Sequence, residues 1–346
     1  MNLSLLNPVW DSSWDDLIAR HPQASVFHQR GWLQALVRTY GYEPFVLTSA
    51  APGEPLKDGL LLCRVSSWMT GTRLVSLPFS DHCEPLLNES NEAPAFANWL
   101  CEQCRERQWS YVEIRPLGVS QGTVSCLQPR GSYWFHELDL SPSLEQLFGR
   151  MHYNSFRRKI RRAERERLSY ETGRSLQLLD EFYRLLCMTR RRHQLIPQPR
   201  AWFENLVACM GDKLQISLAR KNGTGVAAMI TLRHGSCVVY KYGCSDARFH
   251  NLGGMPFLFW KLVEESKLSR AERIDLGRSD LDNEGLVVFK DRLGSQKKQL
   301  TYYRYTNPEA AIPLMPWSSH RFRRLSLVLP DSLLSAAGRL FYRHMG

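Results

Sequence analysis

The residues best suited to chemistry lie in a short stretch between positions 274 and 294. Arg278 and Asp280 follow an apolar triplet that predicts a strand, and Lys290 comes later in the same stretch. Turn and cap residues predict that a helix begins near Glu284 and ends at Gly294. Lys290 then lies on the polar side of this helix and can point back toward the strand end. A strand that delivers Arg278 and Asp280 beside a lysine indicates a site for a charged substrate.

This stretch also resembles a sequence block of the FemAB-like branch of the GNAT acyltransferase superfamily. The matching block is Asp-Leu-Gly-Arg-Ser at 275–279, Glu-Gly at 284–285, Phe-Lys at 289–290 and Leu-Gly at 293–294. Further matching pieces lie at 77–81, 157–163 and 242–246, so the resemblance covers roughly residues 26–305. The resemblance implies two fused GNAT domains and transfer of an acyl group to an amine.

The resemblance also implies roles for individual residues. Lys290 and Arg278 would offset negative charge on the acceptor or on the departing ester, and Asp280 would orient Arg278 or the incoming amine. The residues implied to bind substrate are Tyr242, Gly243, Ser245, Phe289 and His193. Of these, His193 is a lone histidine in a basic loop, so a surface residue without a role is the alternative.

The acyl donor is expected at the end of the strand that contains Gly243. In a GNAT unit this strand is splayed from its neighbour, and a bulge frees a backbone N–H for the acyl carbonyl; Gly243 permits such a bulge. The next helix opens at Gly253 and Gly254, where free N–H groups favour a phosphate. The residues expected to bind donor phosphate are Asn251, Gly253, Gly254, Arg157 and Arg158. Alternatively, the glycine pair merely lets the helix approach the strand.

The acyl donor could be either acyl-coenzyme A or aminoacyl-tRNA. Users of coenzyme A show Arg or Gln followed by x-x-Gly-x-Gly or Ala, and the segment Arg248–Gly254 does not have that spacing. No catalytic base is evident, but general acid–base help is worth only ~3–5 kcal/mol. Positioning can supply ~7–11 kcal/mol and an oxyanion donor ~3–4 kcal/mol. The lack of a base therefore does not exclude acyl transfer.

The elements expected to carry these residues occur in the same order twice. The first set is helices 10–20 and 31–40, strands 44–48, 60–65 and 73–77, helix 93–107, and strands 111–114 and 133–140. A single long basic helix is expected from position 142 to about 167. The second set is helices 176–192 and 200–210, strands 214–219, 225–233 and 236–243, helix 253–267, and strands 274–276 and 299–305. We predict an α/β fold, a tandem duplication of GNAT-like domains with mixed central sheets.

The predicted boundaries are a first domain at 1–141, a second at 142–306 and a basic amphipathic tail at 307–346. The chain of 346 residues carries a net charge of +11 and has a pI of about 9.3. An anionic partner is therefore one interpretation, and solvated arginine-rich helix faces are the other. The basic helix at 157–167 could hold tRNA, and the tail could lie on an anionic membrane or pack on the first domain.

Our expectations about the cellular compartment and about metal binding rest on motifs that the sequence lacks. Residues 1–16 lack a secretory signal, and no stretch approaches the ~20 apolar residues of a membrane span. An odd number of cysteines, nine, favours a reduced cytoplasmic protein. The Cys101-x-x-Cys104 pair is interpreted as core packing rather than a zinc or redox site. We expect a cytoplasmic protein without a metal, with the inner face of the membrane left open by the tail.

The function expected from these observations is N-acyl transfer without a permanently bound cofactor. Acyl-coenzyme A or aminoacyl-tRNA would be the co-substrate. The acceptor would be an amine of a phosphorylated small-molecule or lipid-linked precursor of the cell envelope or an exopolysaccharide. The alternative is a non-catalytic module on the GNAT scaffold that binds tRNA or an anionic membrane.

Overall fold

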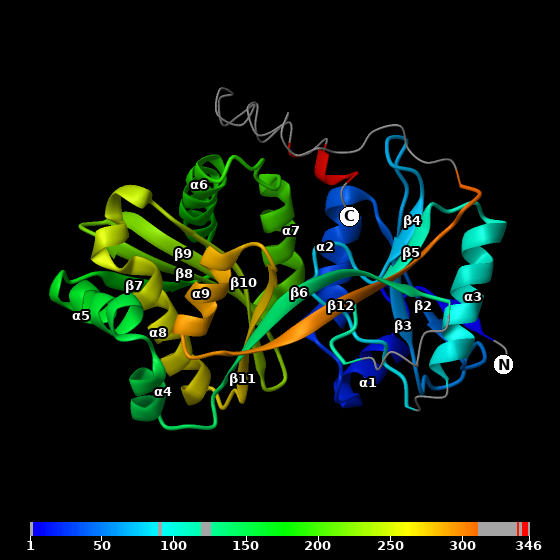
Figure 1. The fold of residues 1–346 in the computed structure, drawn as a ribbon, viewed down its shortest axis with the longest axis horizontal. Coiled ribbons are helices and arrows are strands. Elements are labelled where there is room, and N and C mark those ends of the chain that lie inside the picture. The colour runs from blue at the N-terminus through cyan, green and yellow to red at the C-terminus, as the bar shows by residue number, and fades with distance from the viewer. Residues whose placement is uncertain (1–2, 89–91, 119–125, 311–337, 339–340, 345–346) are drawn as a thin grey trace. The chain divides into compact units, whose positions relative to one another are not determined.

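The computed structural model describes residues 3–88, 92–118, 126–310, 338 and 341–344, which divide into two compact units. Of the described residues, the first unit contains those within 3–133, 300–310 and 341–344, and the second contains 134–299 and 338. The long strands β6 (Gln128–Asp139) and β12 (Gln296–Thr306) each pass from one unit into the other. Figure 1 draws the elements of both units.

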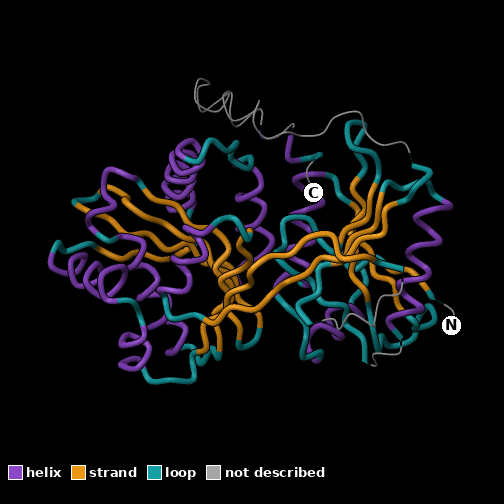
Figure 2. The backbone as a smooth tube through the Cα atoms, viewed as in Figure 1, coloured by secondary structure: helices purple, strands orange, loops and turns teal. Residues whose placement is uncertain are grey.

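The first unit is a mixed sheet covered by helices. Its further elements are β1 (Ser4–Leu6), α1 (Ser13–Arg20), α2 (Arg30–Tyr40), β2 (Glu43–Thr48), β3 (Leu60–Val65), β4 (Arg73–Val75), α3 (Ala93–Glu106) and β5 (Tyr111–Ile114). The strand order is β1-β2-β3-β4-β5-β12. Helix α3 buries Phe96, Leu100 and Cys104 against Leu62 and Val112 of the sheet, which forms one apolar core. Figure 2 shows the strands of this sheet in orange.

The second unit repeats this plan. Its elements, besides β6 and β12, are α4 (Leu144–Arg150), α5 (Arg158–Arg165), β7 (Ser169–Gly173), α6 (Leu176–Arg192), α7 (Arg200–Met210), β8 (Leu214–Lys221), β9 (Thr224–His234), β10 (Cys237–Ser245), α8 (Gly254–Leu268), β11 (Arg273–Asp280) and α9 (Glu284–Arg292). The strand order is β6-β11-β10-β9-β8-β7. Helices α6 and α7 cover one face of this sheet, and α5 and α8 cover the other (Figure 1).

Strand pairing makes the duplication explicit. In the first unit β1 to β4 pair antiparallel in sequence order, and β4 then pairs parallel with β5. In the second unit β7 to β10 pair antiparallel, and β10 then pairs parallel with β11. Two copies of one α/β unit with mixed sheets therefore follow each other along the chain. The predicted fold class is confirmed.

The expected single helix from 142 to 167 is wrong. Helix α4 ends at Arg150, Met151 and His152 are extended, and a π-helical turn (Tyr153–Arg157) leads into α5. The His152 ring accepts a hydrogen bond from Ser155 N at 3.2 Å, so this residue caps the second segment. Its own N–H donates to Arg292 O at 2.9 Å. A backbone contact with a segment far along the chain thus accompanies the break, and helical periodicity alone could not reveal it.

Two further expectations concern cysteines and the tail. Cys101 is bonded to Cys126 in a disulfide, so the expectation of reduced cysteines is wrong at this pair, while Cys104 is buried and free.

At the end of the tail, Arg73 donates to His344 O at 2.7 Å, and Tyr42 donates to Tyr342 O at 2.8 Å. Residues 341–344 therefore pack on the first unit, and most of the tail lies outside the described residues. None of the helices that the structure describes is long and apolar enough to cross a bilayer.

Candidate functional site

Strands β10 and β11 of the second unit are parallel neighbours, and their pairing ends about half-way along each strand. Strands β10 and β11 are paired from Cys237 with Arg273 to Val239 with Asp275, and both strands continue beyond that point. On its other side β10 stays paired with β9, with a register shift between Tyr240 and Tyr242. Such a shift is a β-bulge, which leaves one residue unpaired and re-aims its neighbours. The splayed and bulged strand is the geometry that the GNAT resemblance implies.

The bulge places Tyr240 and Tyr242 on opposite faces of the sheet, although residues two apart on a regular strand share a face. The Tyr240 ring packs on Phe259 of α8, with centroids 4.7 Å apart. The Tyr242 ring packs on Phe203 of α7 at 5.1 Å, and its hydroxyl accepts a hydrogen bond from Trp202 Nε1 at 2.8 Å. Tyr242, predicted to bind substrate, is therefore buried between the sheet and α7.

Gly243 lies directly beside the Tyr240 side chain. A Cβ at this position would be 2.8 Å from Tyr240 Cζ and closer still to the Tyr240 hydroxyl. Only a residue without a side chain fits here, so the sequence needs glycine for the bulged strand to accommodate the tyrosine. Burial raises the pKa of the Tyr240 hydroxyl, which keeps it protonated at neutral pH. Tyr240 was not among the predicted site residues, although its place three residues before the glycine is the signal that points to it.

Lys290 reaches the end of β11, as predicted, but from the buried face of α9 and not from its polar side. Its side chain is anchored by two backbone carbonyls, since Nζ donates to Gly277 O at 3.0 Å and to Arg278 O at 2.9 Å. Only 4% of this residue is exposed. Gly277 has a φ of +69°, a left-handed conformation in mid-strand that favours glycine. A backbone change at Gly277 would therefore move both acceptors of the Lys290 ammonium.

The other predicted residues of this segment are distributed around the strand end. Arg278 is half-buried, and Asp280 is exposed at the last position of β11. Asn283 caps α9, because its side chain accepts a hydrogen bond from Leu286 N at 3.2 Å, so the predicted helix start is confirmed. Phe289 is half-buried and packs on Phe156 with ring centroids 5.1 Å apart.

His136 of β6 is fully buried, and the charge of the Lys290 ammonium acts on its ring. Its Nε2 is 3.3 Å from Asp291 Oδ1, and its Nδ1 has no hydrogen-bond partner among the described residues. Burial, and after it the Lys290 ammonium, lowers the pKa of His136 below its ordinary value. The histidine is therefore neutral at pH 7. No motif in the sequence pointed to it, because strand order alone brings β6 beside β11.

At the far end of β10, Ser245 joins a polar cluster at the start of α8. Its Oγ is 2.9 Å from His250 Nε2, and Arg192 Nη1 is 3.4 Å from the same nitrogen. The backbone N–H of Ser245 donates to Thr189 Oγ1 at 2.9 Å. Burial, Arg192 and Lys159 all lower the pKa of His250. The Asp246 carboxylate acts in the opposite direction but has a smaller effect than either cation, so the potential at the start of α8 is positive and suits an anion.

The two glycines predicted to bind phosphate, Gly253 and Gly254, lie against neighbouring elements. Gly253 has a φ of +79°, and a Cβ there would be 3.0 Å from Lys159 Cβ. A Cβ on Gly254 would be 3.0 Å from Ala227 Cβ. The glycine pair therefore lets α8 approach α5 and β9, while the neighbouring Asn251 is exposed.

The remaining predicted residues are more exposed. Arg157 is half-buried with its guanidinium 5.2 Å from the Tyr153 ring centre, and Arg158 is exposed. His193 is exposed at the C-terminal end of α6, and burial together with Arg192 and Arg190 lowers its pKa. No group of three or more metal-ligating side chains occurs among the described residues.

Comparison with known proteins decides the family of the second unit. Residues 150–284 match the family model described as the acetyltransferase (GNAT) domain. This segment is a GNAT domain. The segment matched by the family model contains the splayed strand β10, helix α8 and strand β11. No curated protein matches the chain.

Solved structures resemble nearly the whole chain at low identity. A crystal structure of FemX matches with a TM-score of 0.69 and 14% identity, covering 88% of this chain and 97% of that one. The C-terminal domain of a putative lysylphosphatidylglycerol synthetase from Agrobacterium fabrum matches with a TM-score of 0.57 and 14% identity, over 88% and 93%. A tandem GNAT protein from the clavulanic acid biosynthesis pathway matches with a TM-score of 0.55 and 12% identity, over 88% and 98%. The FemAB-like fold implied by the sequence block is confirmed.

Proposed function

We propose that this chain transfers an acyl or aminoacyl group to an amine of a cell-envelope or exopolysaccharide precursor. The observation that carries the proposal is the parting of β10 and β11 after Val239 and Asp275, with the bulge beside it. A splayed strand with a bulge offers backbone N–H groups to a carbonyl oxygen, which is how an oxyanion is stabilised. The similarity to the structures of FemX and of a putative lysylphosphatidylglycerol synthetase supports an aminoacyl group and an envelope acceptor.

The donor would lie along β10 with its phosphates at the start of α8. Arg192, Lys159 and the dipole of α8 make this end positive. Coenzyme A and the 3′ end of a charged tRNA both carry phosphates that suit such a potential. Ser245, with its side chain bonded to His250, would contact the donor near its phosphate end. Arg157 and Arg158 precede or begin α5 and would add to the same positive surface.

In the transfer step the acceptor amine attacks the donor carbonyl. A C–N bond forms, and the C–S bond of a thioester or the C–O bond of an aminoacyl ester breaks. The amine loses a proton, and the departing thiolate or alkoxide gains one. The buried Lys290 ammonium at the end of β11 would stabilise negative charge in this step, Arg278 would bind an anionic group of the acceptor, and Asp280 would orient the amine.

The test is a donor and acceptor screen with matched lysine variants. The purified chain is incubated with acetyl-coenzyme A and with charged tRNAs, each with lipid-linked and nucleotide-linked amino sugars or peptides as acceptors. We expect turnover with one donor class and a drop of about 10²-fold or more in Lys290→Ala, the size of the loss when one oxyanion donor is removed. Lys213→Ala, which changes an exposed lysine of the same unit, is the control.

Each outcome of the screen has a definite meaning. Turnover with charged tRNA and none with acetyl-coenzyme A selects the aminoacyl donor. An active protein whose Lys290→Ala form works at the wild-type rate removes the role given to that lysine. Salt-sensitive tRNA binding without turnover of any donor would instead favour the non-catalytic binding module.

A further inference from the structure

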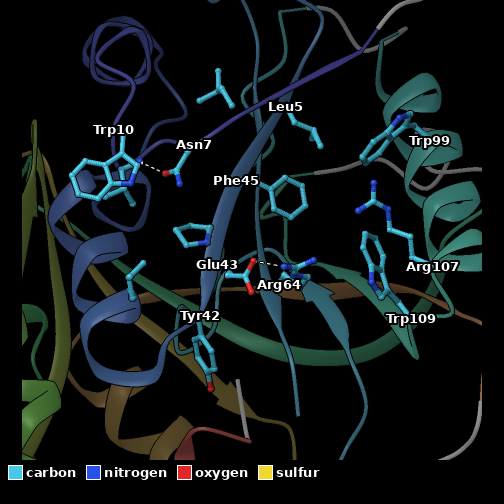
Figure 3. Close-up of a pocket in the computed structure, with 14 residues that line it drawn as sticks. Leu5, Asn7, Trp10, Tyr42, Glu43, Phe45, Arg64, Trp99, Arg107 and Trp109 are labelled. Atoms are coloured by element: carbon cyan, nitrogen blue, oxygen red, sulfur yellow. Dashed lines mark hydrogen bonds and ion pairs between the residues drawn. The ribbon is translucent and has the colours of Figure 1, made fainter. Parts of the chain in front are cut away.

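A groove of about 470 Å³ lies in the first unit, where the edge of its sheet is left uncovered. Strand β1 pairs with β2 only as far as Leu6 with Val46, whereas β2 continues back to Glu43 against β3. The side chains around this uncovered end of β2 line the groove, as Figure 3 shows. Sites for small molecules have volumes of roughly 300–1,000 Å³, so the groove is large enough for one.

Aromatic rings form much of the lining. Trp99 of α3 is half-buried, and Phe45 of β2 packs beside the same core (Figure 3). Trp109, just before β5, is buried and also lines the groove. Trp10 follows β1 and is 79% exposed, which is unusual for so large an apolar ring. Flat rings at two ends of one groove are suited to stack on a ligand that has flat apolar faces.

Charged groups interrupt this apolar lining. Arg64 and Glu43 form an ion pair across β3 and β2, drawn as a dashed line in Figure 3. The Arg107 guanidinium lies 5.5 Å from the Trp109 ring centre, and its Nε donates to Gln103 Oε1 at 2.8 Å. Both members of the ion pair are partly exposed, so each keeps hydrogen-bonding capacity toward the groove.

These charges restrict the class of ligand. A plain hydrocarbon chain would remove water from Glu43 and Arg64 without replacing their hydrogen bonds, which is costly. A phosphate or nucleotide would meet the Glu43 carboxylate, and Arg64 is already paired with that carboxylate, so of the two arginines only Arg107 would be left to bind the anion. A neutral ligand with hydroxyl groups at its rim can replace the hydrogen bonds of the charged side chains and is not repelled by Glu43. Its C–H faces can stack on the indole rings. Sugar rings have this combination.

We propose that the groove binds a neutral oligosaccharide, with pyranose rings stacked on Trp99 and Trp10. Glu43 accepts hydrogen bonds from sugar hydroxyls, and Arg64 and Arg107 donate hydrogen bonds to hydroxyl or ring oxygens. The lining lies entirely within the first unit. The inference therefore stands without the proposed acyl transfer, and either can fail alone.

The test measures binding of cellobiose, maltose and N,N′-diacetylchitobiose to the full chain by calorimetry and tryptophan fluorescence. We expect saturable binding of at least one disaccharide. Trp99→Ala and Trp10→Ala should each weaken it about tenfold, the upper range for loss of one ring contact. Glu43→Gln should weaken it as well, because the amide presents one acceptor where the carboxylate presents two. Trp10 and Glu43 are exposed, so these two variants are expected to fold normally, and circular dichroism checks this for all three.

Trp68→Ala is the matched control, because Trp68 is 85% exposed in the same unit and does not line the groove. Its affinity should equal that of the wild type. Three results overturn the proposal: no saturable binding of any of the three disaccharides, binding that Trp99→Ala leaves unchanged, or binding of decanoate or AMP in place of the sugars. Loss of binding in a folded Trp10→Ala protein with the control intact supports it.

Discussion

At the scale of single residues, the geometry of the second unit depends on which side chains the bulge in β10 separates. Tyr240 and Tyr242 face α8 and α7 respectively, and Gly243 returns to the side of Tyr240. A regular strand would have put both tyrosines on one face. The alternation of side chains thus changes at the point where the acyl carbonyl is expected.

Gly243→Ala should destabilise the protein by about 1–3 kcal/mol, because the added methyl group overlaps the Tyr240 ring. Urea unfolding measures the change. Tyr240→Phe in the same background removes the closest atom and should recover part of the loss. Gly285→Ala is the control: nothing lies within 4 Å of its added Cβ, and alanine in a helix is favoured by roughly 0.5–1 kcal/mol. Equal stabilities of the Gly243→Ala and wild-type proteins would contradict the packing described.

The pH dependence of stability should contain a contribution from His136. Burial and the Lys290 ammonium hold its pKa below 6.5, and Asp291 and Lys297 also act on it. Above pH 6.5 the ring is neutral in the folded and unfolded states, and its contribution is complete. As the pH falls below 6.5, the unfolded chain binds the proton first, so stability is lost.

The loss amounts to about 1.4 kcal/mol for each pKa unit between the two states. His136→Gln lacks this titration, so its stability should fall less between neutral pH and about pH 5. Urea unfolding at several pH values gives the two slopes, and the slope rather than the absolute stability is compared. Identical slopes would mean that the folded protein does not shift the pKa of this histidine.

At the scale of elements, helix α9 matters because it holds Lys290 against the end of β11. Asn283 caps the helix, which has only nine residues, from Glu284 to Arg292. A helix this short depends on its cap and on packing more than on propensity. The break between α4 and α5 shows the same dependence, since His152 both caps the π-helical turn and bonds to Arg292 O at the end of α9.

Asn283→Ala should cost about 1 kcal/mol of stability, because the Leu286 N–H loses its capping acceptor. It should also lower acyl transfer, since fraying of α9 loosens the position of Lys290. Ser175→Ala removes the cap of α6, where the side chain accepts from Leu178 N at 3.2 Å, and is the matched control. We expect a similar loss of stability with a smaller effect on turnover. Equal turnover losses in both variants would indicate a general effect of stability.

At the scale of the whole molecule, two duplicated units carry different features. The second unit holds the splayed strand and the buried lysine. The first holds the aromatic groove and the Cys101–Cys126 disulfide. The disulfide joins α3 to a position 25 residues away, in the unit that the chain enters twice.

Reduction of the disulfide should therefore weaken the first unit in particular. A loop of this length is worth about 3.5 kcal/mol in the chain-entropy model. Thermal unfolding with and without dithiothreitol, followed by tryptophan fluorescence, measures the effect. Cys101→Ser should lower the stability by a similar amount and abolish the response to the reductant. Cys209→Ser, at a half-buried cysteine outside the disulfide, should leave the response intact. A wild-type protein that does not respond to the reductant would show that the two thiols are not joined.

The sequence by itself determined the order of most helices and strands, the cap of α9, the duplication and the GNAT block at 275–294, but it missed the edge strands β1 and β7. These properties depend on residues a few positions apart, and periodicity, turn residues and caps record such short-range preferences. Only the tertiary structure decided that Lys290 is buried on two carbonyls and that His136 lies beside Asp291, 155 positions away. Sheet order and register decide contacts of this kind, and no local pattern encodes them. The Cys101–Cys126 pair and the break at His152 escaped the sequence for the same reason.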